Sequence, residues 1–210
     1  MKHIDNIIFD LGGVILNIRY QNSIEALSKL SGKDVQTLYT QHHQTSLFDD
    51  YETGKTTSAQ FRQGLRELLE TDLSDNQIDQ AWNAMLLDLP AERIHLIEQI
   101  RKDKRVFLLS NTNEIHKTEF CKTFDTVMGA EYGGIDNVFE KAYYSHEMGD
   151  RKPHPSIFQT VIEEQKLDPA KTLFIDDTVQ HIEGAQKTGL QTIHLNNGTT
   201  ILDIFKEYYQ

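Results

Sequence analysis

Short apolar runs alternate with helical patterns along most of the chain. Residues 7–9, 106–109 and 173–175 are rich in β-branched, leucine and aromatic side chains, as strands buried on both faces are, and residues 142–145 and 192–195 form two further short runs. Apolar residues at helical spacing follow or precede these runs, at 94–100, 115–124, 155–162, 179–187 and 201–208. This alternation predicts an α/β protein with a Rossmann-like, doubly wound parallel sheet that is covered by helices on both faces.

The segment 17–89 interrupts this alternation, because strand signals nearly vanish within it. It carries three helical faces, the second capped by Ser58 and the third preceded by Ser74 or Asp75. The residues of the three faces are Ile24, Leu27 and Leu30; Phe61, Leu65, Leu68 and Leu69; and Ile78, Ala81, Trp82, Met85 and Leu86. We therefore expect a core domain of residues 1–16 and 90–210, with a helical insertion at 17–89 that ends near Pro90.

Composition narrows the possible partners. The chain has 210 residues, with Lys+Arg 21 against Asp+Glu 32 and a formal net charge of -11. Such a surface repels nucleic acid, and we find no local basic patch. The single cysteine, Cys121, predicts no internal disulfide. The absence of a signal-like or membrane-spanning apolar stretch favours a cytoplasmic protein. We expect either a monomer or a homodimer.

Polar residues stand where the three buried strands end. Asp10 follows the first strand, Ser110 and Asn111 end the second, and Asp176 and Asp177 end the third. Because the carboxyl ends of parallel strands share one edge of a sheet, these groups are expected to meet there. Three gathered carboxylates need a cation, and oxygen ligands suit Mg²⁺.

A basic loop supplies further positive charge to this edge. Residues 149–155 contain Lys152 between a glycine and two prolines, just before a predicted helix. A lysine point charge and the Ser110 hydroxyl beside a metal describe a site for phosphoryl transfer, in which positioning and charge neutralisation do most of the catalysis.

The ordered set resembles the haloacid dehalogenase (HAD) superfamily of hydrolases. The four motifs are Asp10-Leu11-Gly12-Gly13-Val14, Ser110-Asn111, Lys152-Pro153 and Asp176-Asp177, and residues 17–89 lie where that family carries a helical cap. The Gly12-Gly13 variant and the residues around the other three motifs look most like the branch of bacterial α-D-glucose-1-phosphate phosphatases.

The resemblance implies a role for each motif residue. Asp10 is the expected nucleophile, forming an aspartyl-phosphate, and a Mg²⁺ ligand. Gly12 is expected to offer its backbone carbonyl to the metal, Asp177 to bind it directly, and Asp176 to bind it through water or orient its shell. Ser110, Asn111 and Lys152 are expected to hold the phosphate.

Two positions depart from the family pattern. Gly12 stands where the usual motif has a second Asp that serves as general acid and base, a function that typically contributes ~10²–10⁴ in rate. The glucose-1-phosphatase branch shares this Gly, so its presence does not exclude activity. His181 stands where the fourth motif often has Asn.

Other residues have both a functional and an ordinary interpretation. His116 is a candidate proton donor, and His42 and His43, in the insertion, are candidates to face the site. An exposed or hydrogen-bonded histidine is the favoured interpretation for each. Phe48, Tyr51 and Glu52 either line a substrate-facing surface of the insertion or form its core.

The leading hypothesis is a Mg²⁺-dependent phosphatase for a small phosphomonoester, such as the sugar phosphate glucose 1-phosphate. A catalytically weak or silent phosphate-binding protein is the first alternative, motivated by Gly12. A metal-independent 2-haloacid dehalogenase is the second, and the Asp176-Asp177 pair argues against it.

Overall fold

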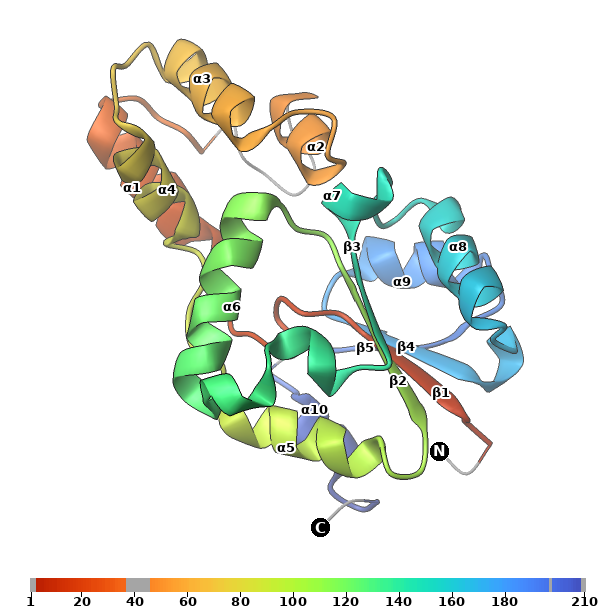
Figure 1. Cartoon of the computed structure of the whole chain (residues 1–210). Helices are drawn as coiled ribbons and strands as arrows, with labels where there is room; N and C mark the ends of the chain where they lie inside the picture. The colour runs from red at the N-terminus through yellow and green to blue at the C-terminus, as the bar shows by residue number, and fades with distance from the viewer. Residues whose placement is uncertain (1–2, 37–45, 197, 209–210) are drawn as a thin grey trace.

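A five-stranded parallel sheet forms the centre of the molecule. The computed structural model describes residues 3–36, 46–196 and 198–208. The strands lie in the order β3-β2-β1-β4-β5, so that β1 is central (Figure 1). Their bounds are β1 Asn6–Phe9, β2 Arg105–Ser110, β3 Lys141–Tyr144, β4 Thr172–Asp176 and β5 Gln191–His194. All five predicted strands are present, and their parallel pairing confirms the predicted sheet.

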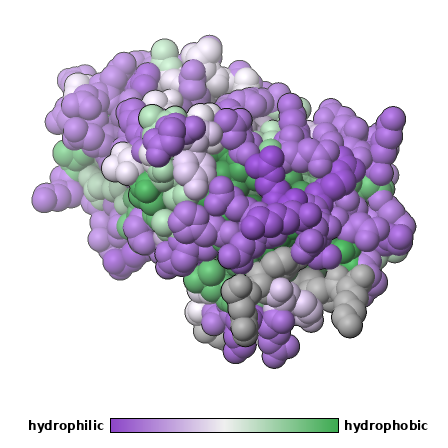
Figure 2. Space-filling model, turned by 60° about the horizontal axis from the view of Figure 1, so that its bottom comes forward, coloured by the Kyte–Doolittle hydropathy of each residue, from purple (hydrophilic) through white to green (hydrophobic). Residues whose placement is uncertain are grey.

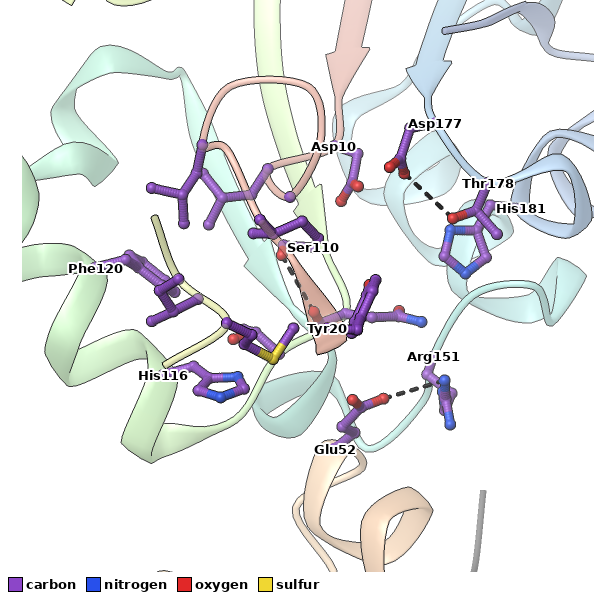
Figure 3. A pocket seen from close by; sticks show the side chains of 18 of the residues that line it. Asp10, Tyr20, Glu52, Ser110, His116, Phe120, Arg151, Asp177, Thr178 and His181 are labelled. Atoms are coloured by element: carbon purple, nitrogen blue, oxygen red, sulfur yellow. Dashed lines mark hydrogen bonds and ion pairs between the residues drawn. The ribbon is translucent and has the colours of Figure 1, made fainter. Parts of the chain in front are cut away.

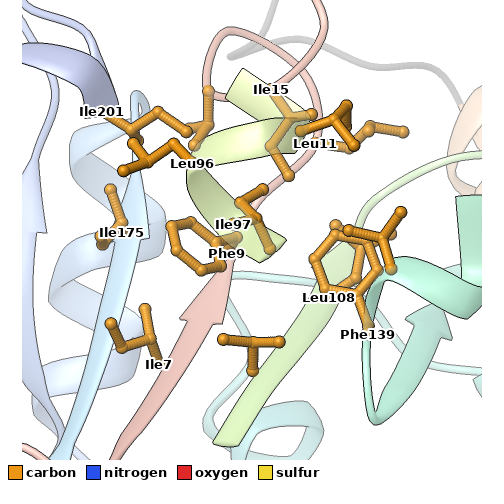
Figure 4. Packing of buried hydrophobic residues seen from close by; sticks show 14 of the residues in the cluster. Ile7, Phe9, Leu11, Ile15, Leu96, Ile97, Leu108, Phe139, Ile175 and Ile201 are labelled. Atoms are coloured by element: carbon orange, nitrogen blue, oxygen red, sulfur yellow. The ribbon is translucent and has the colours of Figure 1, made fainter. Parts of the chain in front are cut away.

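Helices cover both faces of the sheet, as the doubly wound prediction requires. One face carries α5 Ala91–Ile100, α6 Glu114–Met128 and α10 Ile201–Phe205, and the other carries α8 Pro155–Gln165 and α9 Val179–Gln186 (Figure 1). Successive side chains of β1 point to opposite faces of the sheet. Ile7 and Phe9 pack against the face covered by α5, α6 and α10 (Figure 4), and Ile8 packs against the face covered by α8 and α9. All three are fully buried.

The described part of the segment between β1 and α5 forms four helices that share a second hydrophobic cluster, to which Ile115 of α6 also belongs. These are α1 Tyr20–Ser31, α2 Ser46–Glu52, α3 Ser58–Leu69 and α4 Asp75–Asn83. Aromatic side chains fill the cluster, with Phe48 stacked on Trp82 at a centroid distance of 5.4 Å and Tyr51 on Phe61 at 4.2 Å.

Several local expectations need correction. Helix α3 is capped by Thr57, not Ser58, through a reciprocal pair of bonds with Gln60, and Ser74 caps α4 in the same way. Leu30, expected on a buried face, is 40% exposed. The sequence pattern did not predict α2, and α10 ends at Phe205 instead of Tyr208.

The remaining elements are short. Helix α7 Ser145–Met148 follows β3, and the 3-10 turns are η1 Ala130–Tyr132, η2 Ile135–Val138 and η3 Pro169–Lys171. Most of the face shown in Figure 2 is hydrophilic. None of the helices in the described ranges has the length and hydrophobicity needed to cross a membrane.

Candidate active site

The central strand places Asp10 at the carboxyl edge of the sheet. Its backbone N–H donates to the Ile175 carbonyl at 2.9 Å, which fixes Asp10 beside the end of β4. The chain then turns tightly, because the N–H groups of Ile15 and Leu16 both donate to the Leu11 carbonyl at 2.8 Å. Gly13 adopts a φ of +73°, and a Cβ there would lie 2.1 Å from Asp177 Oδ2. Only glycine fits this turn against the carboxylate.

Lys152 bridges two of the expected carboxylates. Its Nζ donates to Asp10 Oδ1 and to Asp176 Oδ2, both at 2.7 Å, and its side chain is fully buried. Asn111 holds the backbone of this lysine: its Oδ1 accepts from the Lys152 N–H and its Nδ2 donates to the Lys152 carbonyl, both at 2.9 Å. The Asn111 side chain therefore positions Lys152, and its expected contact with phosphate stays a prediction.

Asp176 and Asp177 have different surroundings. Asp176 is fully buried, accepting from the Thr178 N–H at 2.8 Å and from His181 Nδ1 at 3.0 and 3.1 Å. His181 thus satisfies the carboxylate at the position where the family often has Asn. Asp177 is less buried, and its Oδ1 accepts from the Thr178 hydroxyl at 3.2 Å (Figure 3).

The three carboxylates converge closely enough to share one ion. Asp10, Asp176 and Asp177 can each offer an oxygen such that these atoms lie within 4.8 Å of one another. Burial, together with the charges of Asp176 and Asp177, raises the pKa of Asp10 to about 8 against the opposing charge of Lys152. Burial also opposes ionisation of Asp176, but Lys152 and His181 hold its pKa at about 2. The charge of one lysine is too small to keep all three carboxylates ionised at neutral pH, so a divalent cation that prefers oxygen ligands fits this donor set.

A cavity of about 180 Å³ opens beside Asp10 (Figure 3). Its polar lining includes Ser110, Tyr20 and Thr178, and helix α2 contributes Glu52 from the opposite side. Glu52 Oε2 lies 3.1 Å from Arg151 Nη2. Burial raises the pKa of Glu52, and the charge of Arg151 opposes that rise. The lining residues are Asp10, Leu11, Gly12, Leu16, Ile18, Tyr20, Glu52, Met85, Leu86, Ser110, Asn111, Thr112, His116, Phe120, Arg151, Pro153, Asp177, Thr178, Gln180 and His181.

Three of the other candidates, His116, Phe48 and Tyr51, form contacts within the protein. His116 lines the cavity, but its Nε2 donates to the Trp82 carbonyl at 3.1 Å and its Nδ1 accepts from Asn113 at 3.1 Å. Burial lowers its pKa to about 4, so it is neutral at pH 7. Phe48 and Tyr51 belong to the cluster of the inserted helices. His42 and His43 lie outside the described residues.

Sequence reasoning missed Tyr20 and Arg151 in the cavity wall. Arg151 could have been found, because it directly precedes Lys152 in the basic loop. Tyr20 begins a helix of the insertion, and no sequence signal set it apart.

Comparison with known proteins identifies the family. The family described as haloacid dehalogenase-like hydrolase matches residues 4–189 of the chain. The chain belongs to the haloacid dehalogenase-like hydrolases. This membership confirms the family resemblance and the predicted fold class.

Named relatives place this hydrolase among the phosphatases of the family. It is 32% identical over 195 residues to the D-ribitol-5-phosphate phosphatase of Bacteroides thetaiotaomicron, covering 93% of each chain. A glyceraldehyde 3-phosphate phosphatase of Pyrococcus abyssi is 27% identical over 116 residues, with 55% of this chain covered. The predicted enzyme class, a phosphatase, is therefore confirmed, although the relatives do not identify the substrate of this chain.

Solved structures of HAD family proteins share the fold of this chain. A HAD family enzyme of B. thetaiotaomicron, crystallised as a variant with magnesium and inorganic phosphate, matches with a TM-score of 0.89 at 36% identity over 96% of this chain and 98% of its own. An L-2-haloacid dehalogenase of Xanthobacter autotrophicus shares the fold alone, with a TM-score of 0.60 at 17% identity. The curated relatives above are named for D-ribitol 5-phosphate and glyceraldehyde 3-phosphate, so the finer resemblance to glucose-1-phosphate phosphatases stays a prediction.

Proposed function

We propose that this hydrolase is a Mg²⁺-dependent phosphatase of small phosphomonoesters, with Asp10 as its nucleophile. The observation that carries the proposal is Lys152 held between Asp10 and Asp176 beside the carboxylate of Asp177. A nucleophile, a fixed cation and a cluster of metal ligands at one sheet edge are the parts that phosphoryl transfer needs.

Asp10, Asp177 and the backbone carbonyl of Gly12 would hold the metal, with Asp176 orienting this arrangement. Asp176 suits the orienting role because it is buried and already accepts from Lys152, His181 and the Thr178 backbone. When bound, Mg²⁺ supplies positive charge that offsets the repulsion between carboxylates and substrate phosphate.

Lys152 directs the reactivity of Asp10. In the described hydrogen bonds of the Asp10 side chain, Lys152 Nζ donates to Oδ1 and not to Oδ2. We assign Oδ2 the attack on phosphorus, which forms the aspartyl-phosphate as the bond from phosphorus to the leaving oxygen breaks. Water then cleaves the aspartyl-phosphate and regenerates Asp10. The Ser110 hydroxyl, in the cavity wall, would donate to a phosphate oxygen.

The leaving oxygen also needs a proton, and Gly12 supplies none. His116, in the cavity wall, is committed to two hydrogen bonds, and Asp176, beside the cavity, already accepts from three donors. We therefore infer that solvent protonates the leaving group, which predicts slower turnover of alkyl phosphates than of esters with acidic leaving groups.

The substrate is proposed to be a sugar or polyol phosphate. D-ribitol 5-phosphate is the first candidate, because the relative named for it spans nearly the whole chain. Glucose 1-phosphate is the second. We further propose that residues 17–89 act as a cap over the core domain 1–16 and 90–210, since Glu52 of that segment lines the cavity.

The test is phosphate release from p-nitrophenyl phosphate and a panel of sugar and polyol phosphates, with Mg²⁺ and with EDTA. We expect Mg²⁺-dependent release, which Asp10→Asn lowers by about 10⁴-fold or more while circular dichroism shows an intact fold. An active Asp10→Asn protein would disprove the nucleophile. Phosphate binding by calorimetry without any release would favour the silent binding protein suggested by Gly12.

A further inference from the structure

The cavity has a second charged end, away from Asp10. Glu52, at the end of helix α2, and Arg151, next to Lys152, both line it, and their side chains approach each other at 3.1 Å (Figure 3). With the phosphate at Asp10 and Ser110, the leaving group of a substrate would extend toward this pair.

This end of the cavity carries surplus negative charge. Arg151 pairs with Asp49, one turn earlier on α2, as well as with Glu52, so two carboxylates share one guanidinium. Among the described lining residues, the charged side chains are Arg151 and the carboxylates of Asp10, Asp177 and Glu52. Metal binding would neutralise Asp10 and Asp177, but it would leave the charge of Glu52 in place.

Glu52 also has spare hydrogen-bonding capacity. The residue is only 9% exposed, and within the described chain its buried Oε2 has no hydrogen-bond partner, only the ion pair with Arg151. A buried carboxylate accepts hydrogen bonds from hydroxyl groups and repels anions more strongly than it would in water.

We propose that Glu52 is a specificity-determining residue that selects phosphomonoesters with an uncharged, hydroxylated leaving group and rejects those with a second anionic group. The proposal rests on the phosphatase function proposed above and names its substrate class. A leaving-group hydroxyl donates to Glu52, whereas a carboxylate or second phosphate there meets a like charge with little solvent to screen it.

A matched pair of substrates tests the proposal. Glycerol 3-phosphate and 3-phosphoglycerate differ at one carbon, where a CH₂OH group is replaced by a carboxylate. We expect the wild-type kcat/KM to favour glycerol 3-phosphate by about tenfold or more, and Glu52→Gln to reduce this preference by about fivefold, chiefly through a lower KM for 3-phosphoglycerate. Glu52→Asp, which keeps the charge, should retain the preference.

Asp49→Asn is the matched control. It removes the other carboxylate partner of Arg151, but Asp49 does not line the cavity. We expect it to leave the preference within about twofold of wild type. Equal hydrolysis of both substrates by wild type, an unchanged preference in Glu52→Gln, or an equal change in Asp49→Asn would overturn the role of Glu52.

p-Nitrophenyl phosphate separates this proposal from the one on which it rests. It has neither a hydroxyl nor a second anionic group in its leaving group. Mg²⁺-dependent release from it, with no discrimination between the matched pair, overturns the Glu52 proposal alone. No release from these three or from the panel of sugar and polyol phosphates overturns the phosphatase function, and the Glu52 proposal with it.

Discussion

At the scale of single residues, Gly12 and Gly13 are neighbours with different constraints. A Cβ on Gly12 would lie 2.9 Å from Ile18 Cδ1, the end of a side chain that can turn away. A Cβ on Gly13 would lie 2.1 Å from Asp177 Oδ2, in a backbone conformation with φ of +73°. The second glycine is therefore required by the carboxylate beside it, and the first is not.

We expect Gly13→Ala to lower kcat/KM by about 100-fold or more and to raise the Mg²⁺ concentration that gives half-maximal activity, because the new methyl group displaces Asp177. Gly12→Ala should lose distinctly less activity. Steady-state assays over a Mg²⁺ titration compare the two variants. Equal losses in both would show that the Gly13 turn tolerates a side chain.

The sequence predicted the charged residues of the site better than their hydrogen-bond partners. Asp10, Lys152, Asp176 and Asp177 were expected together because each stands at a strand end or before a helix. Asn111 stands in the same kind of position, yet its amide binds backbone atoms of a residue distant in sequence. Such a pairing depends on the exact separation of two loops, which no local pattern encodes.

At the scale of elements, helix α9 packs directly on the loop that carries Lys152. A Cβ on Gly184 of this helix would lie 2.2 Å from the Pro153 carbonyl oxygen. Both partners of this contact are backbone, so neither can turn aside as a side chain would. The position of α9 thus depends on the absence of one methyl group.

Gly184→Ala should therefore destabilise the protein by about 1–3 kcal/mol, although alanine favours helix formation over glycine by about 1 kcal/mol. It should also lower kcat, because Pro153 adjoins Lys152. Urea unfolding and steady-state assays measure both effects. Glu183→Ala, at an exposed position of the same helix, is the control; a Gly184→Ala protein as stable and active as this control would contradict the packing argument.

Elements were predictable where the pattern was long or strongly apolar. All five strands were found because their β-branched and aromatic runs stand between polar turns. Helix α2 was missed because its seven residues are too short for a helical period to stand out. Thr57 and Ser58 are both suitable capping residues, and type alone favours Ser58, so the backbone geometry decides for Thr57.

At the scale of the whole molecule, His116 connects the α/β core with the inserted helices α1 to α4. It lies on α6 of the core, and its ring stacks on Trp82 of the inserted helices at 4.9 Å and 12°. Its Nε2–H also donates to the Trp82 carbonyl. The neutral imidazole ring is therefore part of the interface between the core and the inserted helices. Protonation of the ring would place a charge in this buried interface and oppose its packing.

This predicts an acid-sensitive contribution to stability. Burial lowers the folded-state pKa of His116 from 6.5 to about 4, so the unfolded chain binds a proton at pH values where the folded chain does not. The contribution is fully present above pH 6.5 and is lost as the pH falls toward 4. Between pH 8 and pH 5 the loss is about 2 kcal/mol.

His116→Gln, which keeps a side-chain N–H donor without titrating, isolates this effect. Urea unfolding of both proteins at pH 8 and pH 5 should show the wild type losing about 2 kcal/mol more than the variant. Subtracting the free energy of unfolding of the variant from that of the wild type at each pH removes the contribution of the other titrating groups, which the two proteins share. A difference that does not change with pH would mean that His116 titrates alike in the folded and unfolded chains.

The central place of β1 has a consequence for biosynthesis. Its two neighbours are residues 105–110 and 172–176, so the strand before Asp10 leaves the ribosome long before β4 can pair with it. At ~5–20 residues per second, the apolar edge of β1 waits for roughly ten to thirty seconds of translation. Asp176 and Asp177 arrive on that last neighbour. A nascent chain therefore completes its carboxylate cluster only after β4 has been synthesised and has paired with β1.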